Sequence, residues 1–216
     1  VENAGLNPRV AVGYDGRLSS PDLSNALCRG LSAAGVNVIT VGIGPTPMLY
    51  FATHHLKTDA GLMITGSHNP PDFNGIKMMM GSSPFYGDDI QELGNRVSLG
   101  QFGTGQGEGE FSSVDVSDVY IDRLLDCLGD TVLDLKVAWD PGNGSSGDII
   151  RRLVSRLGGT HILINEEIDG TFPNHHPDPT VEDNLEQLKS VVREERCNLG
   201  IGLDGDGDRI GVVDSQ

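Results

Sequence analysis

The amino-acid sequence predicts two consecutive α/β domains, each built on a mixed, mostly parallel sheet sandwiched by helices. Short apolar runs alternate with segments of helical periodicity along most of the chain, a pattern typical of β-α-β units. Several apolar runs stop abruptly at Gly- and Pro-rich loops, as buried strands do where they leave a sheet. The length of 216 residues is sufficient for two small domains with hydrophobic cores.

The first predicted domain covers residues 1–133. Its best-marked helix begins at Ser20, which can cap the helix, and is followed by Pro21, which suits a first turn. Gly35 then ends this helix. The predicted strands are 10–13, 36–41, 61–64 and 76–80, and the further predicted helices are 48–56, 88–97 and 116–128.

The second predicted domain covers residues 134–216, after a boundary around Leu133. Here the alternation of apolar runs and helical segments begins again. The predicted strands are 135–139, 161–164, 199–203 and 210–213, and the predicted helical faces lie within 149–157 and 185–192. The Gly- and Gln-rich stretch 98–110 predicts a loop in the first domain.

The charge and cysteine content indicate which partners to expect. The net charge of −16 argues against nucleic acids and anionic membrane surfaces as partners. No apolar run approaches the length of a membrane span. The three cysteines are widely spaced and form no metal or disulfide pattern, so we expect reduced thiols and a cytoplasmic location.

Ser67 is the first candidate for chemistry. It follows the apolar run 61–64 in a loop with Gly66 before it and two prolines after it. A hydroxyl at the carboxyl end of such a strand lies where α/β sheets bind their ligands. A lone serine in a turn is more often a cap or a turn former, so the local pattern alone does not decide between the two interpretations.

A second candidate is the acidic loop that contains Asp204, Asp206 and Asp208, directly after the apolar run 199–203. An EF-hand calcium loop would need Gly at its sixth position and Glu at its twelfth, where this chain has Arg209 and a serine. A solvated acidic turn is the usual fate of clustered aspartates. Three carboxylates this close repel one another, however, and the alternation with glycine favours a hard cation such as Mg²⁺.

Other polar residues near these two loops have two interpretations each. His68 is a general acid or base, or a structural hydrogen-bonding group in a loop. Lys77 orients a phosphate or sugar hydroxyl, or is a solvated lysine on a strand. Arg209 is the counter-ion of the carboxylates or a phosphate ligand.

His175 and His176 lie in a proline-rich stretch, 172–179. Two adjacent histidines suggest a zinc site in principle, but no cysteine or third histidine accompanies them. The composition therefore favours a rigid loop braced by prolines.

Two of these motifs resemble those of the α-D-phosphohexomutases. Residues 65–70 together with 74–77 are similar to the phosphoserine loop of that family, and residues 204–209 are similar to its metal loop. The segments 13–17 and 172–179 also fit the family. In form, the motifs are nearest to the bacterial phosphomannomutase/phosphoglucomutase branch.

The resemblance implies a phosphoserine at position 67 and a metal centre that uses it. The implied site comprises catalytic Ser67, His68 and Lys77, substrate-binding Asn69 and Arg209, and a metal site of Ser67, Asp204, Asp206 and Asp208. The implied activity is a Mg²⁺-dependent interconversion of hexose 1-phosphate and hexose 6-phosphate, with mannose and glucose both open as the sugar. Hexose 1,6-bisphosphate is then the intermediate and activator, and a small phosphosugar is the expected partner.

The sequence also departs from the family. The Tyr-Asp-x-Arg-Gly segment of the first domain is absent, as are the sugar-recognition loop of the third domain and the phosphate-clamping loop of the fourth. We therefore expect the chain to correspond to the first two domains, trimmed at both ends, and to be inactive without domains 3 and 4. The rival hypothesis is a non-catalytic metal- and phosphate-binding fragment or degenerate relative.

Overall fold

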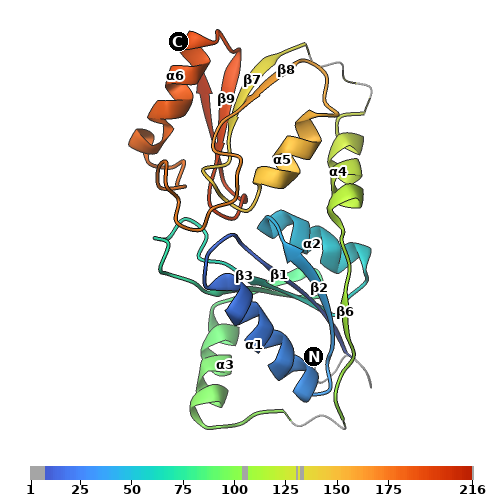
Figure 1. Ribbon diagram of the computed structural model, residues 1–216. Helices are drawn as coiled ribbons and strands as arrows, with labels where there is room; N and C mark the ends of the chain where they lie inside the picture. The colour runs from blue at the N-terminus through green and yellow to red at the C-terminus, as the bar shows by residue number, and fades with distance from the viewer. Residues whose placement is uncertain (1–7, 104–106, 130, 132–133, 216) are drawn as a thin grey trace.

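The computed structural model describes residues 8–103, 107–129, 131 and 134–215. Within these residues it confirms the predicted fold class, with two α/β units that each contain a mixed sheet flanked by helices (Figure 1). The predicted boundary at Leu133 lies outside the described residues, so the domain limits stay a prediction. Among the described helices, none combines the length and apolarity that a membrane crossing requires.

The first sheet has β1 at its centre. In the described part of the chain its strand order is β5-β4-β3-β1-β2-β6. The strands are β1 (Arg9–Tyr14), β2 (Asn37–Ile43), β3 (Ala60–Ile64), β4 (Ile76–Met80), β5 (Ser83–Phe85) and β6 (Phe111–Ser113). The β1–β2, β1–β3 and β2–β6 pairs are parallel, and the β3–β4 and β4–β5 pairs are antiparallel.

The helices cover both faces of this sheet because its central strand is apolar on both sides. Val10 and Val12 of β1 pack with Cys28, whereas Ala11 between them packs with Leu49 on the opposite face. Cys28 belongs to one helix and Leu49 to the next along the chain. The helices are α1 (Ser20–Ala33), α2 (Thr46–His55), α3 (Asp88–Ser98) and α4 (Ser117–Asp126).

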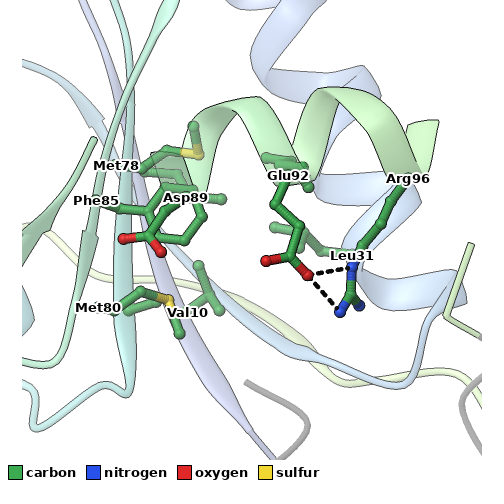
Figure 2. Close-up of a pocket in the computed structure, with 11 residues that line it drawn as sticks. Val10, Leu31, Met78, Met80, Phe85, Asp89, Glu92 and Arg96 are labelled. Carbon is green, nitrogen blue, oxygen red and sulfur yellow. Dashed lines mark hydrogen bonds and ion pairs between the residues drawn. The ribbon is translucent and has the colours of Figure 1, made fainter. Parts of the chain in front are cut away.

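None of the residues of helix α3 is buried. Figure 2 shows a largely apolar pocket beside it, lined among others by Val10, Met78 and Phe85. Glu92 and Arg96 of α3 form an ion pair at 2.9 Å at the rim of this pocket. This part of the first unit is therefore less tightly packed than the central strands.

The second sheet has the order β10-β9-β7-β8 in the described residues. Strand β7 is parallel to β8 and β9, and β10 is antiparallel to β9. Ala138 of β7 packs with one helix, and the next residue, Trp139, packs with the other. The elements are β7 (Lys136–Asp140), α5 (Gly147–Val154), β8 (Thr160–Leu163), the 3₁₀ helix η1 (Glu182–Leu185), α6 (Glu186–Glu194), β9 (Leu199–Leu203) and β10 (Ile210–Asp214).

Three short elements, β5, β6 and η1, were not expected from the sequence. Strand β5 contains Pro84 and has no buried residue, and all three residues of β6 are exposed. Neither strand therefore has the apolar alternation that predicts a strand. Both form because they add to the two edges of an existing sheet.

An apolar cluster joins the two units. It contains Met48 and Leu49 of α2, Ile121 of α4 and Ile149 of α5. Close to it, the N–H of Thr46 at the start of α2 donates to the carbonyl oxygen of Asp206 at 2.8 Å. The loop after β3 and the loop after β9 consequently face each other across the contact between the units (Figure 1).

Candidate active site

Ser67 lies in a turn just after β3, with a backbone conformation that few residues other than glycine adopt. Its φ is +50°, in the left-handed region. Its N–H donates to Oγ1 of Thr65 at 2.8 Å, and the residue is only 8% exposed. The strand end and this hydrogen bond together direct the Ser67 hydroxyl toward the second unit.

The acidic loop is shaped by the first of its aspartates. Oδ1 of Asp204 accepts the N–H groups of Asp208 and Arg209 at 3.0 and 3.1 Å. Gly207 takes a φ of +67°, which glycine adopts without strain. As a result, ligand oxygens of Asp204, Asp206 and Asp208 all lie within 4.8 Å of one another, the one such cluster of metal-ligand side chains among the described residues.

The serine turn and the acidic loop are in direct contact. The hydroxyl of Ser67 donates to Oδ2 of Asp204 at 3.0 Å. A Cβ at position 205 would lie 2.5 Å from the carbonyl oxygen of Ser67, so only glycine fits between the loops without a shift. The hydroxyl and the carboxylate cluster therefore form one site, although 137 positions separate Ser67 from Asp204 in the sequence.

Lys77 completes the cluster from β4. Its Nζ donates to Oδ2 of Asp206 and Oδ2 of Asp208, both at 2.6 Å, and lies 3.4 Å from Oγ of Ser67. Its strand pairs with β3, which leads into the serine turn. The structure thus brings together five of the residues predicted from sequence: Ser67, Lys77, Asp204, Asp206 and Asp208.

Burial adds to the effect of neighbouring charges on the pKa of Asp204 and opposes it for Asp206 and Lys77. Burial, reinforced by the charge of Asp206, raises the pKa of Asp204 to about 6. Burial also disfavours the ionised form of Asp206, but Lys77 and Thr46 outweigh it and lower the pKa of that carboxyl. Burial would lower the pKa of Lys77, yet the attraction and hydrogen bonds of Asp206 and Asp208 leave it raised.

The donor set fits a hard divalent cation. All the candidate ligands are carboxylate or hydroxyl oxygens, which Mg²⁺ prefers. Oδ1 of Asp206 is buried and has no hydrogen-bond partner. A buried, unpaired carboxylate oxygen is costly, and a cation would satisfy it.

The three remaining predicted residues surround this centre. His68 is half-buried, and its Nδ1 is buried without a hydrogen-bond partner. Asn69 is exposed and offers its backbone carbonyl to Arg17. Arg209 is exposed and is fixed through its backbone, which exchanges hydrogen bonds with Asp204.

His68 is near enough to the proline-rich loop of the second unit to affect the pKa of its Asp178 carboxyl. Burial would raise the pKa of the Asp178 carboxyl, but hydrogen bonds from Thr180 and the nearby His68 and His176 rings lower it.

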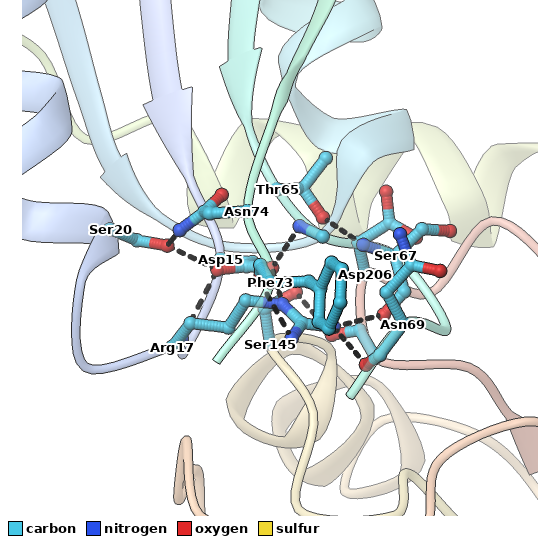
Figure 3. A network of polar contacts seen from close by, with 12 residues as sticks. Asp15, Arg17, Ser20, Thr65, Ser67, Asn69, Phe73, Asn74, Ser145 and Asp206 are labelled. Atoms are coloured by element: carbon cyan, nitrogen blue, oxygen red, sulfur yellow. Dashed lines mark hydrogen bonds and ion pairs between the residues drawn. The ribbon is translucent and has the colours of Figure 1, made fainter. Parts of the chain in front are cut away.

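Sequence reasoning missed two residues that shape the site, Arg17 and Thr46. The hydroxyl of Thr46 donates to Oδ2 of Asp206. The guanidinium of Arg17 lies under the serine turn (Figure 3). Arg17 lies in a segment that fits the family, but no local pattern distinguishes its role. Thr46 lies 160 positions from Asp206, and only the packed fold connects them.

The two adjacent histidines do not form a metal site in the described residues. Nε2 of His175 contacts Oδ2 of Asp140 at 2.9 Å, and its Nδ1 contacts the carbonyl of His176. The hydrogen bond to Asp140 raises the pKa of the His175 ring, although burial opposes this. This pair holds the proline-rich loop to the end of β7, in agreement with the interpretation as a braced loop.

The fold and site together define a class: two linked α/β units whose contact joins a strained serine to a carboxylate cluster suited to a divalent cation. Residues 1–102 match the family description "Phosphoglucomutase/phosphomannomutase, alpha/beta/alpha domain I", and residues 118–216 match domain II of the same family. The chain belongs to the phosphoglucomutase/phosphomannomutase family. The predicted resemblance is therefore confirmed.

Curated relatives and solved structures agree with this assignment. The chain is 43% identical to a phosphomannomutase/phosphoglucomutase of Pseudomonas aeruginosa and 42% identical to a phosphoglucomutase of Neisseria gonorrhoeae, with 95% of this chain and 44% of each relative covered. A crystal structure of a phosphoglucomutase/phosphomannomutase family protein from Burkholderia thailandensis has a TM-score of 0.88 and 42% identity, and covers 96% of this chain and 46% of that one. The chain thus spans less than half the length of these relatives.

Proposed function

We propose that this chain carries the phosphoryl donor and metal site of a phosphohexomutase, which interconverts hexose 1-phosphate and hexose 6-phosphate of mannose, glucose or both. The observation that carries the proposal is the contact of Ser67 with Asp204 at 3.0 Å within the cluster of three aspartates. The relatives are named as enzymes that act on these two sugars, which supports the substrate class.

The proposed reaction moves one phosphoryl group in each of two steps. In the first step, the bond between phosphorus and Oγ of phospho-Ser67 breaks while a bond forms to the free hydroxyl of the hexose phosphate, which loses its proton. In the second step, the bond between the other phosphorus of the hexose 1,6-bisphosphate and its sugar oxygen breaks while a bond forms from that phosphorus to Oγ of Ser67. A proton then returns to the released sugar hydroxyl, so that the donor is restored.

The side chains around Ser67 suit this chemistry. Phosphoryl transfer depends on positioning and on neutralisation of charge. Lys77, 3.4 Å from Oγ of Ser67, holds a positive charge beside the transferring group. His68, with its unpaired Nδ1, is the proposed carrier of the hydroxyl proton, and Asn69 and Arg209 are placed in exposed positions to contact the sugar phosphate.

A bound Mg²⁺ would be held by Asp204, Asp206, Asp208 and an oxygen on Ser67, and would supply charge neutralisation to the phosphoryl group. The unpaired, buried Oδ1 of Asp206 supports this assignment. Lys77 also donates to two of these carboxylates and partly neutralises them.

The rest of the proposed enzyme lies outside this chain. Since the chain spans about 44% of the curated relatives, we propose that sugar recognition and the grip on the non-reacting phosphate come from further domains. The three free cysteines and the sugar-phosphate chemistry support a cytoplasmic setting. Hexose 1,6-bisphosphate would serve as activator by phosphorylating Ser67.

The test is the intact mass of the protein after incubation with glucose 1,6-bisphosphate and Mg²⁺. We expect a gain of one phosphate, with Ser67→Ala abolishing the gain. Ser98→Ala, which changes an exposed serine at the end of α3, is the matched control and should be phosphorylated like the wild type. A gain of phosphate by Ser67→Ala, or no gain by the wild type, would contradict the proposal.

A further inference from the structure

Arg17 is a fully buried arginine beneath the serine turn. The residue is 1% exposed, in the segment between β1 and α1. A buried guanidinium is costly unless each of its donors is satisfied. The acceptors around the guanidinium therefore show which part of the chain Arg17 holds in place.

All five N–H donors of the Arg17 guanidinium have acceptors. Its Nε donates to Oδ2 of Asp15 at 3.0 Å, which supplies the counter-charge. The other two nitrogens donate to four backbone carbonyls of one short segment, at distances between 2.5 and 3.1 Å (Figure 3). The four acceptors are the carbonyl oxygens of Ser67, Asn69, Pro70 and Phe73.

These bonds fix the backbone on which the reactive serine sits. The carbonyl of Ser67 itself is held at 2.7 Å while its φ stays at +50°. Such a conformation persists only where the surrounding contacts enforce it. Next to it, a Cβ at position 66 would lie 2.5 Å from Cζ and Nε of Arg17, so Gly66 is the residue that lets the guanidinium approach.

Asp15 ties the same arrangement to the first sheet. Its two oxygens accept the N–H groups of Arg17 and Gly66 and the hydroxyl of Ser20. The amide of Asn74 donates in turn to Oγ of Ser20. The guanidinium is therefore held in one position by a hydrogen-bond network that includes the sheet and the start of α1.

The second unit covers the other side of Arg17. The ring of Phe172 lies over the guanidinium, with Cζ 5.2 Å from the ring centroid. The backbone just before Phe172 also approaches Arg17, since a Cβ at position 170 would lie 2.7 Å from Cα of Arg17. Arg17 thus contacts the serine turn and the second unit at once.

We propose that Arg17 is a positioning residue for phosphoryl transfer: it holds the turn at Ser67 in the strained conformation that presents Oγ to the carboxylate cluster, and Phe172 secures it there. The inference rests on the proposed function for its catalytic consequence, but its structural part does not. Lysine cannot replace Arg17, because an ammonium has three donors and cannot reach four carbonyls and a carboxylate together.

The experiment compares Arg17→Lys with Arg29→Lys, an exposed arginine on α1 that serves as matched control. The first measurement is the rate of Ser67 phosphorylation by glucose 1,6-bisphosphate over a range of concentrations, expressed per folded molecule. A displacement of the hydroxyl by about 1 Å costs on the order of a hundredfold in rate. We expect a loss of that size in the maximal rate of Arg17→Lys, with little change in the concentration that gives half of it.

The second measurement is amide hydrogen exchange over residues 66–73, which needs no catalytic activity. We expect faster exchange there in Arg17→Lys and wild-type exchange in Arg29→Lys. A purely structural role predicts lower global stability with an unchanged phosphorylation rate per folded molecule, and that outcome would overturn the proposal. If the wild type takes no phosphate, the proposed function fails, while the exchange data still decide whether Arg17 holds the turn.

Phe172→Leu keeps the inference testable if Arg17→Lys does not fold. It removes the ring over the guanidinium and leaves the five hydrogen bonds in place. We expect a several-fold loss in phosphorylation rate and faster exchange over residues 66–73. Wild-type values for both in a folded Phe172→Leu protein would overturn the part assigned to Phe172, and with it the link to the second unit.

Discussion

Thr46 and Asp206 are hydrogen-bonded twice across the two units. The N–H of Thr46 donates to the carbonyl oxygen of Asp206 at 2.8 Å, and its hydroxyl donates to Oδ2 of the same residue. Thr46 is the first residue of α2, where the helix dipole favours a negative charge. The first unit therefore fixes a proposed metal ligand that belongs to the second.

We predict that Thr46→Val weakens Mg²⁺ binding by roughly 10–100-fold, the usual effect of removing a group that orients a ligand. Valine keeps the shape of threonine but leaves Asp206 without this hydroxyl. Isothermal titration calorimetry with Mg²⁺ measures the effect directly. Thr53→Val is the matched control, since Thr53 is also a buried threonine of α2 but its hydroxyl donates to the carbonyl of Leu49. Equal Mg²⁺ affinities for the two variants would contradict the role of Thr46.

The pair of His175 and Asp140 predicts a pH dependence of stability. The hydrogen bond to Asp140 raises the pKa of His175 above its ordinary value of 6.5 in the folded chain. The folded state then binds this proton more tightly than the unfolded state does. The stabilisation is complete below pH 6.5 and is lost as the pH rises through the raised pKa.

We therefore predict that His175→Gln, which cannot titrate, lowers the free energy of unfolding by about 1 kcal/mol at acidic pH. Because glutamine can still donate one neutral hydrogen bond, the difference from the wild type should shrink at alkaline pH. Urea unfolding on both sides of the transition gives the two values. His54→Gln, an exposed histidine near the end of α2, should keep the wild-type profile. A difference that grows toward alkaline pH would show that the sign is wrong.

Most of the fold could be predicted because its central strands carry a local signal. Strand β1 is apolar on both faces, and β9 is a short apolar run that ends at an acidic loop. Strand β6 shows the limit of this reasoning. Its three exposed residues, Phe111 to Ser113, are held by pairing with β2, and the sequence of β6 does not contain that information.

The candidate site was predictable where its chemistry is local and not where it depends on the packing of the units. The spacing of Asp204, Asp206 and Asp208 indicates a cation site without any structure. By contrast, Thr46 and Arg17 look like an ordinary helix start and an ordinary loop arginine. Their roles arise from contacts with residues 160 and 50 positions away, which become visible only after the domains are packed.

We also predict that the 216-residue chain alone is a poor mutase. Its two units hold the proposed donor and metal ligands, while the proposed grip on the remote phosphate lies elsewhere. Such positioning supplies on the order of 7–11 kcal/mol of a barrier. A coupled assay with glucose 1-phosphate or mannose 1-phosphate, beside the Pseudomonas aeruginosa relative, should give a rate more than about tenfold lower, a difference of ~1.4 kcal/mol in the barrier. Turnover within that factor would refute the dependence on further domains.

Gly205 provides the sharpest test of the contact between the serine turn and the acidic loop. A Cβ there would lie 2.5 Å from the carbonyl oxygen of Ser67, and the same oxygen accepts a hydrogen bond from Arg17. The turn therefore cannot shift without disturbing the hydrogen bond to Arg17, which is 2.7 Å long. The acidic loop must move instead, and Asp204 and Asp206 move with it.

We predict that Gly205→Ala leaves the protein folded but reduces Ser67 phosphorylation by glucose 1,6-bisphosphate by about a hundredfold, because the hydroxyl and the carboxylates separate by a distance on the order of 1 Å. Intact mass spectrometry over time gives the rate, and thermal unfolding reports the fold. Gly30→Ala is the matched control, since a Cβ at that position of α1 meets nothing within 4 Å. Alanine in an exposed helix stabilises by up to about 1 kcal/mol relative to glycine, so this variant should be slightly more stable and fully active. If Gly205→Ala accepts phosphate as fast as Gly30→Ala, the close contact of the two loops has no part in the transfer.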